Sequence, residues 1–125
     1  MENYFEWKHF NDIYLEDSYV LEIIESDTNL VFKMELVLLE NNPLYTTPLP
    51  NEQYCYYLGK IEFRETDILM WIDKNKISPS IDLNNEIDYG NIDALYKEGD
   101  IYFIEGDFGK ISLRCKELSL IYLSL

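Results

Sequence analysis

The sequence has few of the residues on which enzyme sites are usually built, and none of the motifs that arrange them. His9 is the only histidine in 125 residues, so any Ser-His-Asp or Cys-His arrangement would have to use it. No serine lies in a Gly-x-Ser-x-Gly turn, and the sequence has no phosphate-cradling loop and no Rossmann fingerprint. These absences argue against nucleophilic catalysis and nucleotide-dependent chemistry. His9 lies in an aromatic segment and fits a structural, hydrogen-bonded imidazole better.

Cysteine and long apolar runs are also scarce. Cys55 and Cys115 belong to no paired spacing typical of a metal or redox site, and both fall in apolar strands. Buried reduced thiols are favoured, and a disulfide is the alternative for a secreted chain.

The longest apolar runs, such as residues 36–39 and 118–123, are far below the ~20 residues that span a bilayer. The acidic N-terminus does not resemble a secretory signal, so we expect a cytoplasmic protein without a membrane segment.

Positive charge is scarce as well, because 24 acids face only ten lysines and arginines, for a net charge of −14. Such a charge repels nucleic-acid phosphate and anionic lipid. The excess negative charge is concentrated in two stretches. Residues 12–40 and residues 82–107 each contain eight acids and one lysine, and in the rest of the chain acids and bases are equal in number. A basic protein surface is therefore the partner that the charge favours, and solubility is the alternative explanation.

Apolar and aromatic residues are abundant, and their alternation is typical of strands. Hydrophobic residues make up 47% of the chain and no linker divides it, so we predict a single domain over residues 1–125. The clearest strand places every second residue from Leu30 to Leu38 on one face. Strands predicted over 19–25 and 30–39, over 53–64 and 67–73, and over 100–105 and 110–116 form three hairpins, and 118–123 adds a last strand.

Turn and cap residues complete the predicted fold. Residues 40–52 form a proline-containing surface loop, and residues 74–91 form an irregular connection in which we expect function. Asn91 as N-cap and Gly99 after the last turn predict a short helix between them, and Gly59 predicts a bulge. The predicted fold is mainly β, or α+β with short helices, with six to seven antiparallel strands in a sandwich or half-open barrel.

A calcium-like pattern is the sharpest metal-binding signal in the chain. Oxygen ligands recur at alternate positions, and the candidate ligands are Asp82, Asn84, Glu86, Asp88 and Asp93. The pattern departs from an EF-hand, because Ile87 stands where glycine is needed and no helix can be read before the loop. A solvated acidic loop is therefore favoured, and no cofactor is predicted.

The same region offers a binding surface. The candidate partner-binding residues are Asp82, Glu86, Asp88, Tyr89, Asp93 and Asp107. Tyrosine is enriched at interfaces because it joins a large apolar surface to a polar tip, although ordinary half-buried sheets also use it. Carboxylate pairs can act as general acid and base, so a hydrolase stays open, with no catalytic residue assigned.

Three segments resemble small bacterial β-rich domains: Phe10-x-Asp12-x-Tyr14, Tyr54-Cys55-Tyr56, and the span from Asp88-Tyr89-Gly90 to Gly106-Asp107-Phe108-Gly109. Some of those domains are similar to immunity proteins of polymorphic toxin systems. The resemblance implies a bacterial protein that neutralises a toxin by direct binding, and it transfers no catalytic residue.

We therefore predict an acidic protein-binding domain, an immunity-type inhibitor of a basic bacterial effector or toxin, and favour binding over catalysis. The alternatives are a carboxylate-dependent hydrolase and a self-associating structural or regulatory domain. Monomer and homodimer are both compatible with the sequence.

Overall fold

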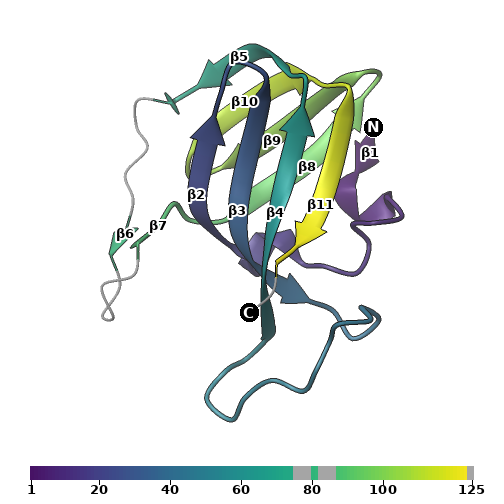
Figure 1. Ribbon diagram of the computed structural model, residues 1–125, viewed down its shortest axis with the longest axis vertical. Helices are drawn as coiled ribbons and strands as arrows, with labels where there is room; N and C mark the ends of the chain where they lie inside the picture. Colours follow the sequence, from purple (N-terminus) through teal and green to yellow (C-terminus); the bar gives the residue numbers. More distant parts are fainter. Residues whose placement is uncertain (75–79, 82–86, 124–125) are drawn as a thin grey trace.

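The computed structural model describes residues 1–74, 80–81 and 87–123, and its strands form a β sandwich (Figure 1). Nine strands lie in two antiparallel sheets that are not closed into a barrel, where six or seven strands were expected. Helical structure among the described residues is limited to short 3₁₀ segments, of which η1 (Tyr4–Glu6) and η2 (Leu15–Asp17) are described in full. The mainly β prediction is therefore confirmed. No described helix is long and apolar enough to cross a membrane.

The two sheets have different strand orders. The four-stranded sheet contains, in order, β11 (Glu117–Tyr122), β4 (Cys55–Arg64), β3 (Asn29–Leu38) and β2 (Tyr19–Glu25). The five-stranded sheet contains β1 (Glu2–Asn3), β8 (Ile92–Glu98), β9 (Ile101–Gly106), β10 (Gly109–Arg114) and β5 (Asp67–Ile72). A separate pair joins β6 (Ser80–Ile81) to β7 (Ile87–Asp88).

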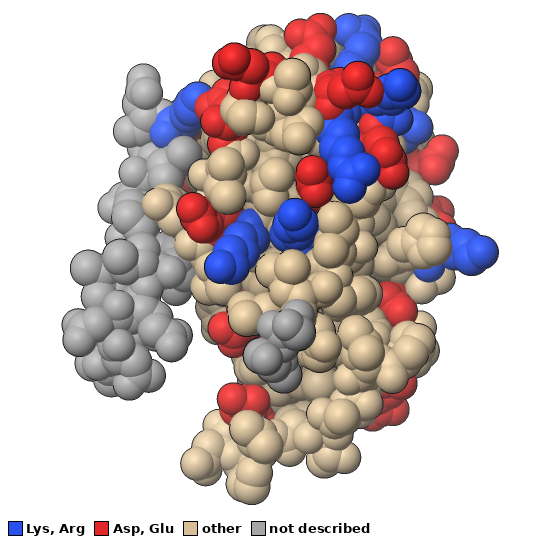
Figure 2. Space-filling model, in the orientation of Figure 1, with Lys and Arg blue, Asp and Glu red and all other residues tan. Residues whose placement is uncertain are grey.

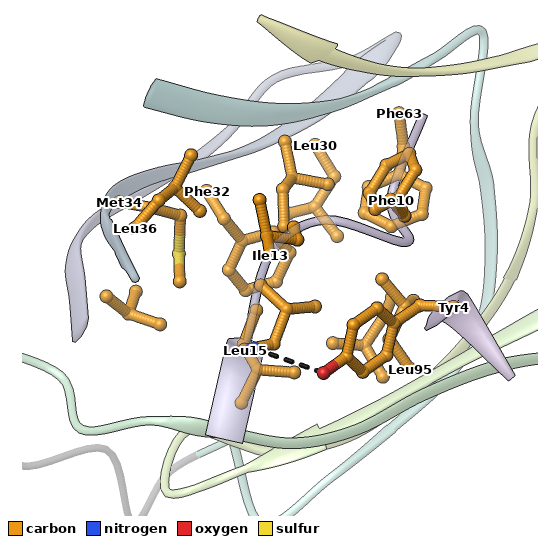
Figure 3. Packing of buried hydrophobic residues seen from close by; sticks show 14 of the residues in the cluster. Tyr4, Phe10, Ile13, Leu15, Leu30, Phe32, Met34, Leu36, Phe63 and Leu95 are labelled. Carbon is orange, nitrogen blue, oxygen red and sulfur yellow. Dashed lines mark hydrogen bonds between the residues drawn. The ribbon is translucent and has the colours of Figure 1, made fainter. Parts of the chain in front are cut away.

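The alternation along β3 builds the core, as predicted. Leu30, Phe32, Met34 and Leu36 are fully buried on the inner face of the four-stranded sheet (Figure 3). The N-terminal segment adds a further part of the core, where the Leu15 backbone N–H donates to the Tyr4 hydroxyl at 3.1 Å. Each sheet thus buries one face, because alternate side chains of a strand point to opposite sides.

The first and third hairpins and the last strand are confirmed. The β2–β3 hairpin turns at residues 27–28, and the β9–β10 hairpin turns at Asp107 and Phe108. Phe108 folds back from this turn into the core, with its ring centroid 5.1 Å from that of Phe32. Its carbonyl also accepts a hydrogen bond from Trp71 Nε1 at 3.0 Å. A turn residue therefore helps to join the two sheets.

The predicted helix over residues 91–99 is wrong, because this segment forms β8 and pairs along its length with β9. The residues interpreted as caps have other roles. Asn91 Nδ2 donates to the Ser18 carbonyl at 2.6 Å, and Gly99 has a φ of +61° at the first position of the two-residue β8–β9 turn. Glycine suits this hairpin position for the same reason that it suits a helix end, namely its tolerance of positive φ.

The predicted second hairpin is also wrong, because β4 and β5 lie in different sheets. Both edges of β4 are occupied, by β3 and by β11, so β5 pairs with β10 instead. The chain changes sheets next to Glu65, whose φ is +50°.

The bulge predicted at Gly59 is absent, since β3 and β4 stay in register along all ten pairs. A Cβ at Gly59 would lie 2.5 Å from Leu36 Cδ1 and 3.0 Å from the Ile121 carbonyl oxygen. The glycine therefore provides space for close packing rather than a change of register.

We predict that Phe108→Ala lowers the free energy of unfolding by about 3–5 kcal/mol, the usual cost of removing a buried phenylalanine side chain. Urea denaturation at neutral pH measures this cost. Leu49→Ala is the control, because Leu49 is 65% exposed and its truncation is expected to change stability by at most about 0.5 kcal/mol. A Phe108→Ala cost as small as that of the control would contradict the packing of this turn into the core.

Candidate functional site

The outer face of the five-stranded sheet carries an apolar centre. One register row crosses four strands and faces away from the core; it consists of Tyr96, Phe103, Ser112 and Met70. The Tyr96 and Phe103 rings are stacked, with centroids 4.9 Å apart and planes within 10° of parallel. Met70 is 56% exposed, and Ile72, from the adjacent row, is 46% exposed. Together with Lys110 and Glu105, these residues line a shallow depression of about 230 Å³.

Glu105 connects this apolar centre to charged groups. It lies opposite Lys110 in the sheet, and its Oε1 is 3.7 Å from Lys110 Nζ. The Tyr96 hydroxyl lies close enough to Glu105 for the carboxylate to affect its titration. Burial raises the pKa of Tyr96, and the charges of Glu105 and Glu98 raise it further. Tyr96 therefore stays neutral beside the carboxylate.

Three carboxylates from different parts of the chain lie close enough to Asp93 to affect its titration. Partial burial raises the pKa of Asp93, and the nearby negative charges of Asp107, Glu105 and Glu16 raise it further. Glu16 comes from the first acidic stretch of the sequence, and the others come from the second. The fold thus unites the two stretches in an acidic cluster of Asp93, Glu105, Asp107 and Glu16.

Asp107 is also tied into the backbone. Its Oδ2 accepts a hydrogen bond from the Asn91 backbone N–H at 3.2 Å. Gly90 has a φ of +83°, and a Cβ there would lie 1.8 Å from Asp107 Oδ2, so only glycine leaves room for this contact. The carboxylate is consequently held near Asp93 by the segment that leads into β8.

The other predicted site residues have different positions. Tyr89 is half-buried against the core, and its backbone N–H donates to the Val20 carbonyl at 2.7 Å, so it helps to hold the fold. Asp88 lies in β7, and only its backbone is described. Asp82, Asn84 and Glu86 lie outside the described residues.

The residues that sequence reasoning missed are those contributed by the outer face of the sheet, namely Met70, Ile72, Tyr96, Phe103 and Glu105. The signal for Tyr96, Phe103 and Glu105 was the alternation in residues 92–98 and 101–106, whereas the exposure of Met70 and Ile72 depends on which sheet β5 joins. Interpreting the first of these segments as a helix concealed the row that joins Tyr96 to Phe103.

The remaining candidate groups do not assemble into a catalytic or metal site. His9 is exposed rather than enclosed by the aromatic residues around it. Cys55 is buried and Cys115 is half-buried, and both are free thiols, as expected; burial raises the pKa of Cys115. Among the described residues, no group of three or more His, Cys, Asp or Glu side chains is placed to hold a metal ion.

No protein family model, curated protein or solved structure matches this chain. The comparisons therefore leave the resemblance to immunity proteins without support and without contradiction.

We predict that Asp93→Asn stabilises the protein at pH 7. A raised pKa means that the folded state binds more protons than the unfolded state between the ordinary value of 3.8 and the folded-state value. The stability contributed by Asp93 therefore falls as the pH rises through that window. Because Asp93 is exposed and solvent screens its charge, the gain should be below about 1 kcal/mol.

Urea denaturation as a function of pH tests this sign. The gain from Asp93→Asn should vanish below pH 3.8, where both states are protonated, and should shrink in high salt. Glu40→Gln, which neutralises an exposed acid far along the chain, is the control for net charge. An equal gain in stability for both variants, or a gain for Asp93→Asn that persists in acid, would contradict the claim that its surroundings raise the pKa of Asp93.

We expect calcium at about 1 mM, within the range of weak protein sites, to leave the melting temperature unchanged. The described backbone on both sides of residues 82–86 forms strands rather than the helices of an EF-hand. Differential scanning fluorimetry with magnesium as control measures the effect. A calcium-specific rise of several degrees would instead establish the calcium site, with Asp88→Asn and Asp93→Asn expected to abolish it.

Proposed function

We propose that the protein binds a basic protein partner through the outer face of its five-stranded sheet. The supporting observation is the position of the acidic cluster at the edge of an exposed apolar centre, where Tyr96 stacks on Phe103. Protein interfaces commonly combine an aromatic and methionine-rich centre with a polar rim. Charged rim residues chiefly speed association and select partners of complementary charge.

The distribution of cations on the molecule supports the same face. The described ion pairs occupy Lys60, Arg64, Lys74, Lys110, Arg114 and Lys116. On the outside of the four-stranded sheet, lysines and arginines are interspersed with acids (Figure 2). Among the described residues, no cation forms an ion pair with Asp93 or Asp107. The charges of Asp93 and Asp107 are therefore not neutralised by a described cation, whereas Glu105 is paired with Lys110.

The partner that fits this charge is a basic effector or toxin, and the protein acts as its immunity-type inhibitor. The resemblance of the sequence to immunity-related bacterial domains supports this assignment. The carboxylate-dependent hydrolase has less support, because Glu105 is the one member of the acidic cluster that lines the depression on this face, and that depression is shallow.

A pair of matched double variants tests the proposed surface. Asp93→Asn with Glu105→Gln removes two charges from the cluster, and Glu40→Gln with Glu52→Gln removes two exposed charges elsewhere. Proteins captured by the wild-type chain from its source organism at low salt are identified, and the dominant one is purified for kinetic measurements.

We expect a partner of basic isoelectric point whose affinity falls with salt. The cluster variant should weaken binding about tenfold, mostly through slower association, and the control by twofold or less. An acidic partner, or equal effects of the two double variants, would contradict the proposed face. Met70→Ser should slow association little and speed dissociation, because it removes apolar contact without changing charge.

A further inference from the structure

A second surface runs along the free edge of the four-stranded sheet. A groove of about 620 Å³ lies between β11 and two loop segments, residues 8–12 and 42–44. In Figure 1, β11 is the strand at the right-hand edge of this sheet, beside the N-terminal segment. The residues that line the groove from β11 include Leu118, Leu120 and Tyr122.

The backbone of β11 presents unpaired hydrogen-bonding groups to this groove. Among the described strands, β11 pairs with β4 alone. The Leu123 N–H donates to the Leu58 carbonyl at 2.9 Å, which identifies the residues of this pair as hydrogen-bonded. Hydrogen-bonded and non-bonded pairs alternate in an antiparallel ladder. The N–H and C=O groups of Leu118, Leu120 and Tyr122 therefore point away from β4, toward the groove.

The side chains around the groove specify which peptide would fit. The inner side is apolar, because Phe10, Leu118 and Leu120 pack into or against the core. On the outer side, Glu117 is opposite Arg64 of β4 and is 59% exposed. Glu117 forms an ion pair with Arg64 at 3.4 Å but stays open to solvent. A strand added beside β11 would place its alternate residues next to these two surfaces, so apolar residues fit the inner side and a basic residue fits the outer side beside Glu117.

Charge further restricts the occupant. Asp12 lines the groove, and its Oδ1 has no hydrogen-bond partner among the described residues, so a donor from a ligand would satisfy it. Lys8 and His9 also lie on the groove, so its own charge is nearly balanced. The net charge of −14 then disfavours both an acidic peptide and a second copy of the chain.

We propose that the groove binds an extended peptide segment of alternating apolar and basic residues, added as a fifth strand beside β11. Strand addition draws affinity from main-chain hydrogen bonds and specificity from alternate side chains. This site lies on the four-stranded sheet, whereas the proposed partner-binding face lies on the five-stranded sheet, so the two proposals are independent.

Synthetic peptides test the site with residue resolution. Residues 117–122 span ~20 Å at ~3.3 Å per residue, so the probes are about six residues long: alternating valine and lysine, and alternating valine and glutamate. Amide hydrogen exchange is followed by NMR. In the free protein, the amides of Leu118, Leu120 and Tyr122 should exchange much faster than those of Ser119 and Ile121, which are bonded to β4.

The valine–lysine peptide should slow exchange of those three amides at least tenfold, and the valine–glutamate peptide should not. Absence of binding, binding without this protection, or equal protection by both peptides would overturn the proposal. Protection in the free protein that grows with concentration, together with a dimer mass by light scattering, would assign the edge to a second copy and also overturn it.

Charge variants locate the peptide without depending on the other face. Glu117→Gln should weaken the valine–lysine peptide about two- to fivefold, the range of one exposed ion pair, whereas Glu22→Gln on β2 should change its affinity little. Asp93→Asn with Glu105→Gln should have no larger effect on the peptide than Glu40→Gln with Glu52→Gln. The assignment to the groove would be overturned if Glu22→Gln weakened peptide binding more than Glu117→Gln. It would also be overturned if the Asp93/Glu105 double variant weakened it more than the Glu40/Glu52 double variant.

Discussion

The ten-pair ladder between β3 and β4 is the constraint from which the arrangement of the two sheets follows. Residues 29–38 and 55–64 stay in register along its whole length, and Gly59 permits close packing in its middle. Because β3 and β11 then occupy both edges of β4, β5 cannot pair with β4 as a hairpin. It crosses to β10, and this crossing brings Met70 and Ile72 beside the stacked rings of Tyr96 and Phe103. The candidate surface is thus a consequence of the central ladder.

Local patterns predicted the elements whose partners are close in sequence. The alternation from Leu30 to Leu38 and the turn residues before it specify both a strand and its hairpin. The same reasoning failed for β4 and β5, because which edge of β4 is free depends on β11, more than 50 residues later. The helix prediction for residues 91–99 failed for another reason. Asparagine, aspartate and glycine favour helix caps and hairpin turns alike, and pairing with β9 decided between the two structures.

Part of the candidate site could be predicted from charge, but its apolar half could not. Asp93 and Asp107 were identified because acids and glycines are visible in the sequence, and the structure places them in one cluster. Glu16 and Glu105 joined them only through tertiary packing of η2 and β9. The exposed positions of Met70 and Ile72 depend on which sheet β5 joins, and this information is not local. The groove along β11 likewise depends on where the N-terminal segment lies.

The raised pKa of Asp93 links the stability of the fold to the binding proposed for this surface. Partial burial of Asp93 and repulsion from the neighbouring carboxylates both disfavour its charged form, so this group works against folding at neutral pH. A cation placed among them by a partner reverses the sign of this interaction and lowers the pKa of Asp93. Binding would then release protons at pH values between the bound and free pKa, and the partner would stabilise the folded state by more than its apolar contacts provide. Such a surface is unfavourable for the isolated chain at neutral pH and becomes favourable in the complex, which is the energetic arrangement expected of a binding face.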